Sequence, residues 1–152
     1  MVDSEKLMDF YTLLATLSLI VQFVVLALLF GGLWLKKTKK FRQHGITMLT
    51  AVVLHTITIL VVMVPSFISG FSSPASIDLA NALVVTSLVH AFAGIAALLL
   101  GVWLVASWRL KADMKTCFAK KSIMRVTITI WLIALFLGIF MYWTFYAPIL
   151  FG

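Results

Sequence analysis

Two histidines, His55 and His90, lie near the middle of two long hydrophobic segments. An ionisable ring in the hydrocarbon core of a membrane is costly, so such residues are rare there and usually face a bundle interior, a cofactor or a proton path. Two imidazoles that face each other at one depth can bind a b-type haem, because the iron takes one axial nitrogen from each side. Histidine also ligates copper, so the residue types alone leave haem and copper open.

The depth of each ring follows from the rise of a helix, about 1.5 Å per residue. His55 comes about 16 Å beyond His44, which opens the same segment, and His90 lies roughly 18 Å beyond the start of the next segment. Because consecutive segments cross a core of about 30 Å in opposite directions, we expect the two rings at nearly one level on neighbouring helices. The pattern predicts His55 and His90 as the axial ligands of one haem b.

Small residues surround His90. Ser87, Gly94 and Gly101 recur at seven-residue spacing, so they lie on one stripe of the helix together with His90. Such a stripe either makes room for a porphyrin, with Ser87 and Gly94 beside it, or serves close packing between helices. The ordinary alternative for the histidines is a buried ring that bonds to a hydroxyl group of a neighbouring helix. Four hydroxyl groups are candidates for that bond, those of Thr56, Thr58, Thr86 and Ser87.

A second candidate site lies at the start of the same segment as His55. Met48 follows His44 by four residues, so both side chains share a helix face. Imidazole and thioether are ligands for copper, so His44 and Met48 predict a second metal site. His55 and His90 are metal candidates at the first site. The alternative for His44, beside Arg42, is a solvated ring or a contact with lipid headgroups.

The composition indicates an integral membrane protein. The chain has 152 residues, of which 63% are hydrophobic, and its mean hydropathy is +1.14. A soluble domain of this size could not bury so much apolar surface. The sequence predicts an all-α, four-helix transmembrane bundle that forms one domain over residues 1–152. The expected spans are 10–35, 46–68, 79–108 and 123–145.

Turn-forming residues mark the expected loop between the second and third spans. Pro65, Gly70 and Pro74 are expected to end the second helix, since proline and glycine both disfavour helix interiors. Ser76 is expected to cap the third helix, with Asp78 in its first turn. The single cysteine, Cys117, cannot form a disulfide within the chain.

Basic residues predict the orientation in the membrane. Of the 12 lysine and arginine residues, all but Lys6 lie in or directly beside the two stretches that join spans one and two and spans three and four. The positive-inside rule then places both basic loops in the cytoplasm and both termini outside, as in a multi-pass protein of the cell membrane. This placement explains the net charge of +7. We therefore expect the lipid bilayer as the partner of these charges and no nucleic-acid partner. Six aromatic residues are expected as interfacial anchors: Trp34 and Trp108 on the cytoplasmic side, and Tyr142, Trp143, Tyr146 and Tyr11 on the external side.

Short motifs in spans two to four resemble a family of small four-helix membrane proteins. The motifs are FRQHGITMLTA from Phe41, LVHAFAG from Leu88 and RVTITIWL from Arg125. The family is catalogued as domain of unknown function 420 and is associated with the assembly of cytochrome c oxidase. The resemblance implies His44, Met48 and His90 as functional positions and Trp131 as a structural one. Two features depart from the family, whose pattern has a histidine just before span four and a proline before the position of Ile130.

These observations leave three functions open. The leading hypothesis is a small membrane protein that binds haem b, or a subunit of a redox complex, and transfers electrons. The alternative is an accessory or assembly subunit of a haem-copper oxidase or another membrane metalloenzyme, which handles copper or haem. The third is a purely structural subunit. A larger membrane redox complex or a second copy of the chain is the expected partner. No Ser-His-Asp set and no intramembrane acid is present, and Gln22 is the only strongly polar residue in span one, so an enzyme or proton pump is not favoured.

Overall fold

The computed structural model describes residues 4–72, 78–108 and 120–151, with side chains for 10–72, 78–108 and 120–146. All regular structure in these residues is helical. The helices are α1 (Ser4–Lys37), α2 (Phe41–Thr58), the π-helical segment η1 (Ile59–Met63), α3 (Val64–Gly70), α4 (Ala82–Trp108) and α6 (Lys121–Phe151). Four of the described helical stretches are long and apolar enough to cross a membrane, α2, η1 and α3 together forming one of them. The predicted all-α architecture with four candidate spans is confirmed.

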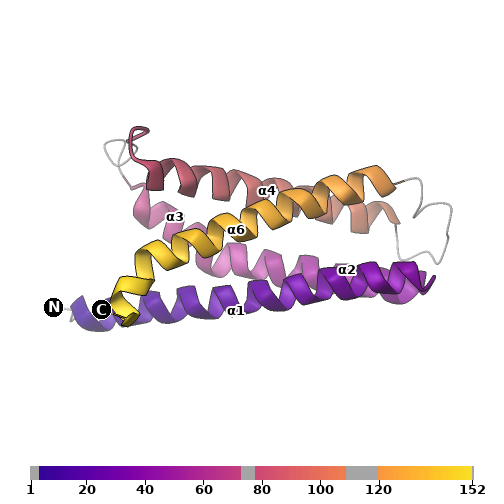
Figure 1. Ribbon diagram of the computed structural model, residues 1–152, viewed down its shortest axis with the longest axis horizontal. Coiled ribbons are helices and arrows are strands. Elements are labelled where there is room, and N and C mark those ends of the chain that lie inside the picture. The colour runs from indigo at the N-terminus through magenta and orange to yellow at the C-terminus, as the bar shows by residue number, and fades with distance from the viewer. Residues whose placement is uncertain (1–3, 73–77, 109–119, 152) are drawn as a thin grey trace.

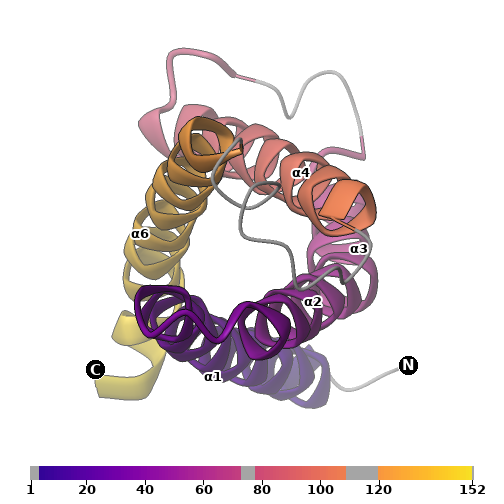
Figure 2. The ribbon, with the colours of Figure 1, turned by 90° about the vertical axis from the view of Figure 1, so that its right-hand side faces the viewer.

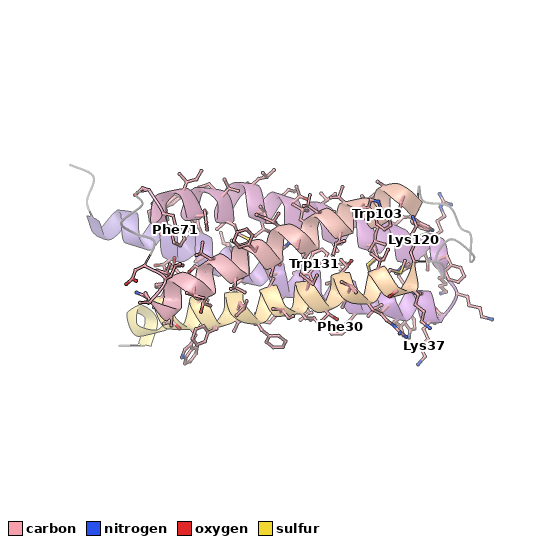
Figure 3. All side chains as sticks on the ribbon, turned by 90° about the horizontal axis from the view of Figure 1, so that it is seen from above. Phe30, Lys37, Phe71, Trp103, Lys120 and Trp131 are labelled. Carbon is pink, nitrogen blue, oxygen red and sulfur yellow. The ribbon has the colours of Figure 1, made fainter. Side chains whose placement is uncertain are left out.

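The four long helices form an up-and-down bundle. Seen along the bundle, α1, α2, α4 and α6 follow one another around a ring (Figure 2). The helices make their most extensive contacts within two pairs, α1 with α2 and α4 with α6, and the two pairs touch each other less. Both ends of the chain lie at one end of the bundle (Figure 1), and Lys37 and Lys120 lie at the other (Figure 3). All described basic residues except Lys6 therefore gather at the end opposite the termini, referred to below as the basic end.

A short turn joins α1 to α2. Lys39 adopts a left-handed conformation with φ of 62°. The amide of Lys39 donates to the carbonyl of Lys36, and the amide of Lys40 donates to the carbonyl of Leu35, at 3.1 and 2.9 Å. This is the Schellman arrangement that satisfies carbonyl groups at a helix end. Because the turn is so short, α2 folds back directly along α1.

The second span is longer than predicted, because Pro65 does not end it. The helix continues from Phe41 through η1 and Pro65 to Gly70. Proline lacks an N–H group, and its ring collides with the carbonyl four residues earlier in a regular α-helix. The π-helical turn at Ile59–Met63 widens the helix just before Pro65, which then stands in the first turn of α3. Pro74, which was also expected to help end this helix, lies outside the described residues.

The third span starts later than predicted. Helix α4 begins at Ala82, and the amide of Leu83 donates to the side-chain oxygen of Asn81 at 2.9 Å. Asn81 therefore caps the helix, as short polar side chains do at helix starts. The helix thus begins three residues after the expected start at residue 79, and Ser76, the expected cap, lies outside the described residues. Asp78 precedes the helix and accepts a hydrogen bond from the amide of Ala80.

The core lies where the four helices meet, and apolar side chains cover the outside. The buried cluster comprises Val25, Leu29, Ala51, Val52, Ala97 and Trp131. Large apolar residues such as Phe92 and Phe136 point outward and are more than half exposed, as expected for helices that face lipid. Trp34 and Trp143 are also exposed, which is compatible with anchoring. Trp108 is only 6% exposed and packs over Gly45, so its predicted role as an interfacial anchor was wrong.

Candidate functional site

His55 lies at the centre of the bundle. It is 2% exposed and is the largest fully buried side chain among the described residues. Its Nδ1 atom is 3.3 Å from the side-chain nitrogen of Gln22 on α1, and its ring centroid is 4.5 Å from that of Trp131 on α6, with 43° between the ring planes. The backbone of Gly94 and the ring of His90, both on α4, lie within electrostatic range. His55 on α2 is thus close to all three other long helices.

The Nε2 atom of His55 is buried and makes no hydrogen bond of standard geometry within the described part of the chain, although the backbone of Gly94 is close enough to interact with the ring. In the amide orientation of the structure, Gln22 donates to Nδ1, which puts the single ring proton on Nε2. Rotation of the amide by 180° would instead present its oxygen to Nδ1–H and leave Nε2 with a free lone pair. The pair Gln22–His55 can therefore hold either tautomer, and the second one is competent to bind a metal.

His90 is held by the neighbouring helix α6. Its Nδ1–H donates to the backbone carbonyl of Ala134 at 2.8 Å, which leaves Nε2 as the atom with a free lone pair. The ring lies in a notch at Gly138, where a Cβ atom would come within 3.0 Å of the His90 Cε1 atom. A histidine whose Nδ1–H bonds to a backbone carbonyl is the usual arrangement around metal-binding imidazoles, because that bond fixes tautomer and orientation.

The expected bonds from these histidines to hydroxyl groups are not formed. The hydroxyl groups of Thr56, Thr58, Thr86 and Ser87 each donate to the carbonyl four residues earlier in their own helix. The partners of His55 and His90 are instead a side-chain amide and a backbone carbonyl. Hydroxyl side chains in apolar helices bond locally because the i−4 carbonyl is always within reach. The hydroxyl alternative was therefore wrong for both rings.

The stripe of small residues on α4 divides into two parts. At Gly101 a Cβ atom would lie 3.1 Å from a methyl group of Val52, so this glycine serves the close approach of α4 to α2. Gly94 is buried, but a Cβ atom there would meet nothing within 4 Å. The structure therefore has unfilled space on the face of α4 that lies near His55. Ser87 is half-buried and occupied with its own helix.

The donor set fits a haem more readily than a closed metal cage. No group of three or more His, Cys, Asp or Glu residues that could hold a metal ion occurs in the described part of the chain. Axial ligation of a haem needs only two protein donors, and the bonds at Nδ1 leave Nε2 of His55 and of His90 as the candidate donor atoms. A Cβ atom at Gly94 would meet nothing within 4 Å, and the α1–α2 pair contacts the α4–α6 pair less than the helices contact each other within a pair, so a porphyrin between these histidines would have to enter between the two pairs.

His44 occupies a second buried position, near the basic end. It is 5% exposed, and its Nδ1–H donates to the carbonyl of Gly32 at 2.7 Å. The alternative of a solvated ring or a headgroup contact was therefore wrong. Met48 packs on the same glycine: its Sδ atom and the His44 Nδ1 atom lie 3.6 and 3.5 Å from the place that a Cβ of Gly32 would take. The structure thus brings His44 and Met48 together but keeps them apart from the midplane pair.

A cavity of about 60 Å³ lies beside His44 and Met48. Residues of all four long helices line it, and they include Trp108, Met124 and Trp131. Both tryptophans are buried, and neither indole N–H has a hydrogen-bond partner among the described residues. Because Trp131 also contacts His55, the cavity is adjacent to the midplane pair on one side.

Sequence reasoning missed the roles of two residues, Gln22 and Met124. Gln22 had a signal, because a lone amide in an apolar span is costly unless it has a buried partner. Met124 had none, since methionine is an ordinary apolar residue of membrane helices and the chain holds 7 of them. Only the arrangement of the helices in the bundle shows that Met124 of α6 lines the same cavity as His44 of α2.

Comparison with known proteins found no similar protein. No protein-family model, no curated protein and no solved structure matches the chain. The resemblance to the family catalogued as domain of unknown function 420 therefore stays a prediction.

Proposed function

We propose that this protein binds one haem b between its two helix pairs, with His55 and His90 as axial ligands, and acts as a membrane electron-transfer protein or redox-complex subunit. The observation that carries the proposal is how the two rings are held. Each imidazole is anchored through Nδ1, by Gln22 or by the carbonyl of Ala134, and the Nε2 atom of His55 is buried inside the membrane-spanning region without a hydrogen bond of standard geometry. Such a nitrogen is costly to bury unless it has a use.

The residues around the pair supply orientation and an apolar environment. The carbonyl of Ala134 fixes the His90 tautomer, and the notch at Gly138 fixes its ring position. Gln22 orients His55, and the indole of Trp131 covers the face of that ring. A haem bound there would supply a one-electron couple between ferric and ferrous iron. The apolar helices keep water from the site and lower the local dielectric, which is how a protein tunes such a couple.

The surface and charge pattern support a place in the bilayer. The outward faces of the spans are apolar, and we infer from the positive-inside rule that the basic end faces the cytoplasm of a cell membrane. The apolar outer faces can contact either lipid or another membrane protein. The electron partner is then a larger membrane redox complex or a second copy of this chain.

Haem titration of the full chain tests the proposal. The protein is purified in mild detergent, incubated with haem b, and followed by optical and electron paramagnetic resonance spectroscopy. We expect one haem per chain with the low-spin signature of two histidine ligands. His55→Ala and His90→Ala should each abolish that signature, whereas His44→Ala should retain it. Helix content measured by circular dichroism shows whether each variant is folded. His55→Met and His90→Met serve as second variants, expected to fold and to give altered axial ligation.

Two results would overturn the proposal. One is wild-type protein that is folded and binds no haem stoichiometrically. The other is a low-spin signature that survives in folded His55→Ala and His90→Ala proteins.

A further inference from the structure

The cavity near the basic end brings together three soft donor side chains from two helices. His44 and Met48 come from α2 and Met124 from α6, and all three line the cavity. We propose that these residues form a binding site for a single Cu(I) ion. The site lies beyond the proposed haem function, because none of its three ligands belongs to the midplane pair.

His44 is prepared for ligation in the same way as His90. Its Nδ1–H donates to the carbonyl of Gly32 on α1 at 2.7 Å, so only Nε2 carries a lone pair. This bond to a backbone carbonyl fixes the tautomer and the ring plane, as it does around most metal-binding histidines. The ring is almost fully buried, so the free-energy cost of removing it from water has already been borne when the protein folds.

The thioether sulfurs of Met48 and Met124 determine which metal ion the site prefers. Cys and Met ligands are soft and select Cu(I), whereas Zn²⁺ favours thiolate, imidazole and carboxylate. The described residues that line the cavity include no carboxylate or thiol, so a divalent ion would find no negative charge there. A site with one imidazole and two thioethers is instead suited to a monovalent soft cation.

The cavity also fits the ion in size and surroundings. Its volume of about 60 Å³ exceeds the roughly 10–15 Å³ needed by one water molecule, so the cavity has room for one ion. The indole ring of Trp108 lines the same space and packs over Gly45, where a Cβ atom would collide with it. An aromatic face beside a bound cation adds a favourable cation–π interaction.

Lys36 opposes the site and provides a second test of it. Its ammonium group donates to the Met124 sulfur at 3.4 Å, so it competes for a ligand and repels a cation. Lys36 stands in the last turn of α1, from which a long side chain can turn outward to the interface. Replacement by the neutral Lys36→Gln should therefore tighten Cu(I) binding by about tenfold.

The experiment is an anaerobic titration of the full chain in detergent micelles with Cu(I), in competition with a chromogenic Cu(I) chelator. X-ray absorption spectroscopy then identifies the ligand atoms. We expect one Cu(I) per chain, with sulfur and nitrogen scatterers. Met48→Leu and Met124→Leu should each weaken binding at least tenfold, because leucine preserves the volume and removes the sulfur. Met141→Leu, on the same helix α6, is the matched control and should leave binding unchanged.

Three results would overturn the proposal. They are the absence of stoichiometric Cu(I) in folded wild-type protein, a spectrum without sulfur scatterers, and undiminished binding in folded Met48→Leu and Met124→Leu proteins. Circular dichroism reports the fold of every variant. His55→Ala and His90→Ala should retain Cu(I), so failure of the haem proposal and failure of the copper proposal are distinguishable.

Discussion

The Nδ1 atom of His55 lies 3.3 Å from the side-chain amide nitrogen of Gln22, across the contact between α2 and α1. Both side chains are buried, and Gln22 is the polar partner that orients the central histidine. This contact links the first helix to the candidate site, although α1 contributes no ligand to it. The effect of this contact on protein stability can be measured without haem, and its effect on haem affinity can be measured by titration.

Gln22→Leu should destabilise the protein and weaken haem binding. The substitution leaves Nδ1 of His55 buried without a partner, which costs about 1–3 kcal/mol. Loss of an orienting partner of this kind typically lowers affinity about 10–100-fold. Thermal unfolding and haem titration in micelles measure the two effects. The control is Gln43→Leu, at an exposed position of α2, for which neither quantity should change appreciably. Equal behaviour of the two variants would contradict the assigned role of Gln22.

Gly94→Val should separate folding from haem binding. A Cβ atom at Gly94 meets nothing within 4 Å, so a small side chain fits the protein without haem. The valine methyl groups would occupy the space that we assign to the porphyrin. We therefore expect an unchanged or slightly higher melting temperature and a haem affinity at least tenfold lower. Gly31→Val is a suitable control, because Gly31 also has open space and lies on α1. Unimpaired haem binding by Gly94→Val would place the haem elsewhere.

Gly138→Ala should displace His90. The new methyl carbon would lie 3.0 Å from Cε1 of the imidazole, closer than nearly all contacts of this kind, so the ring must shift away from the Ala134 carbonyl. We expect a change from the low-spin signature of two histidine ligands to a high-spin or mixed spectrum. Gly70→Ala, where the added carbon meets nothing within 4 Å, should give the wild-type spectrum. A wild-type spectrum for Gly138→Ala would show that His90 is not held in this notch when haem is bound.

Lys39→Gly should stabilise the turn between α1 and α2. Lys39 adopts φ of 62°, and a left-handed conformation costs a non-glycine residue about 1–2 kcal/mol. Glycine adopts it without that cost, so the unfolding free energy should rise by about 1 kcal/mol. Lys37→Gly removes the same charge from the last turn of α1 and should instead lower stability slightly. Unfolding in mixed micelles measures both variants, and a loss of stability in Lys39→Gly would contradict this account of the turn.

Much of the fold could be predicted from the order of the residues. Long apolar runs can satisfy their backbone groups in a membrane only as helices, and basic residues separate these runs at two places. Segment boundaries were less predictable, because they depend on local contacts. Pro65 is accommodated by the π-helical turn before it, and Asn81 caps α4. Neither effect is visible in average preferences for proline or serine.

The candidate site divides in the same way. The sequence by itself determined that His55 and His90 are costly polar residues in apolar helices, because composition and helix rise are local properties. Only the tertiary structure decided what each ring contacts: Gln22 from α1 and Trp131 from α6 around His55, and the Ala134 carbonyl behind His90. It also placed Met124 and His44 in the lining of one cavity and left space at Gly94. These relationships depend on how four nearly uniformly apolar helices are rotated against one another, and a helix that is apolar on all sides carries no pattern that specifies its rotation.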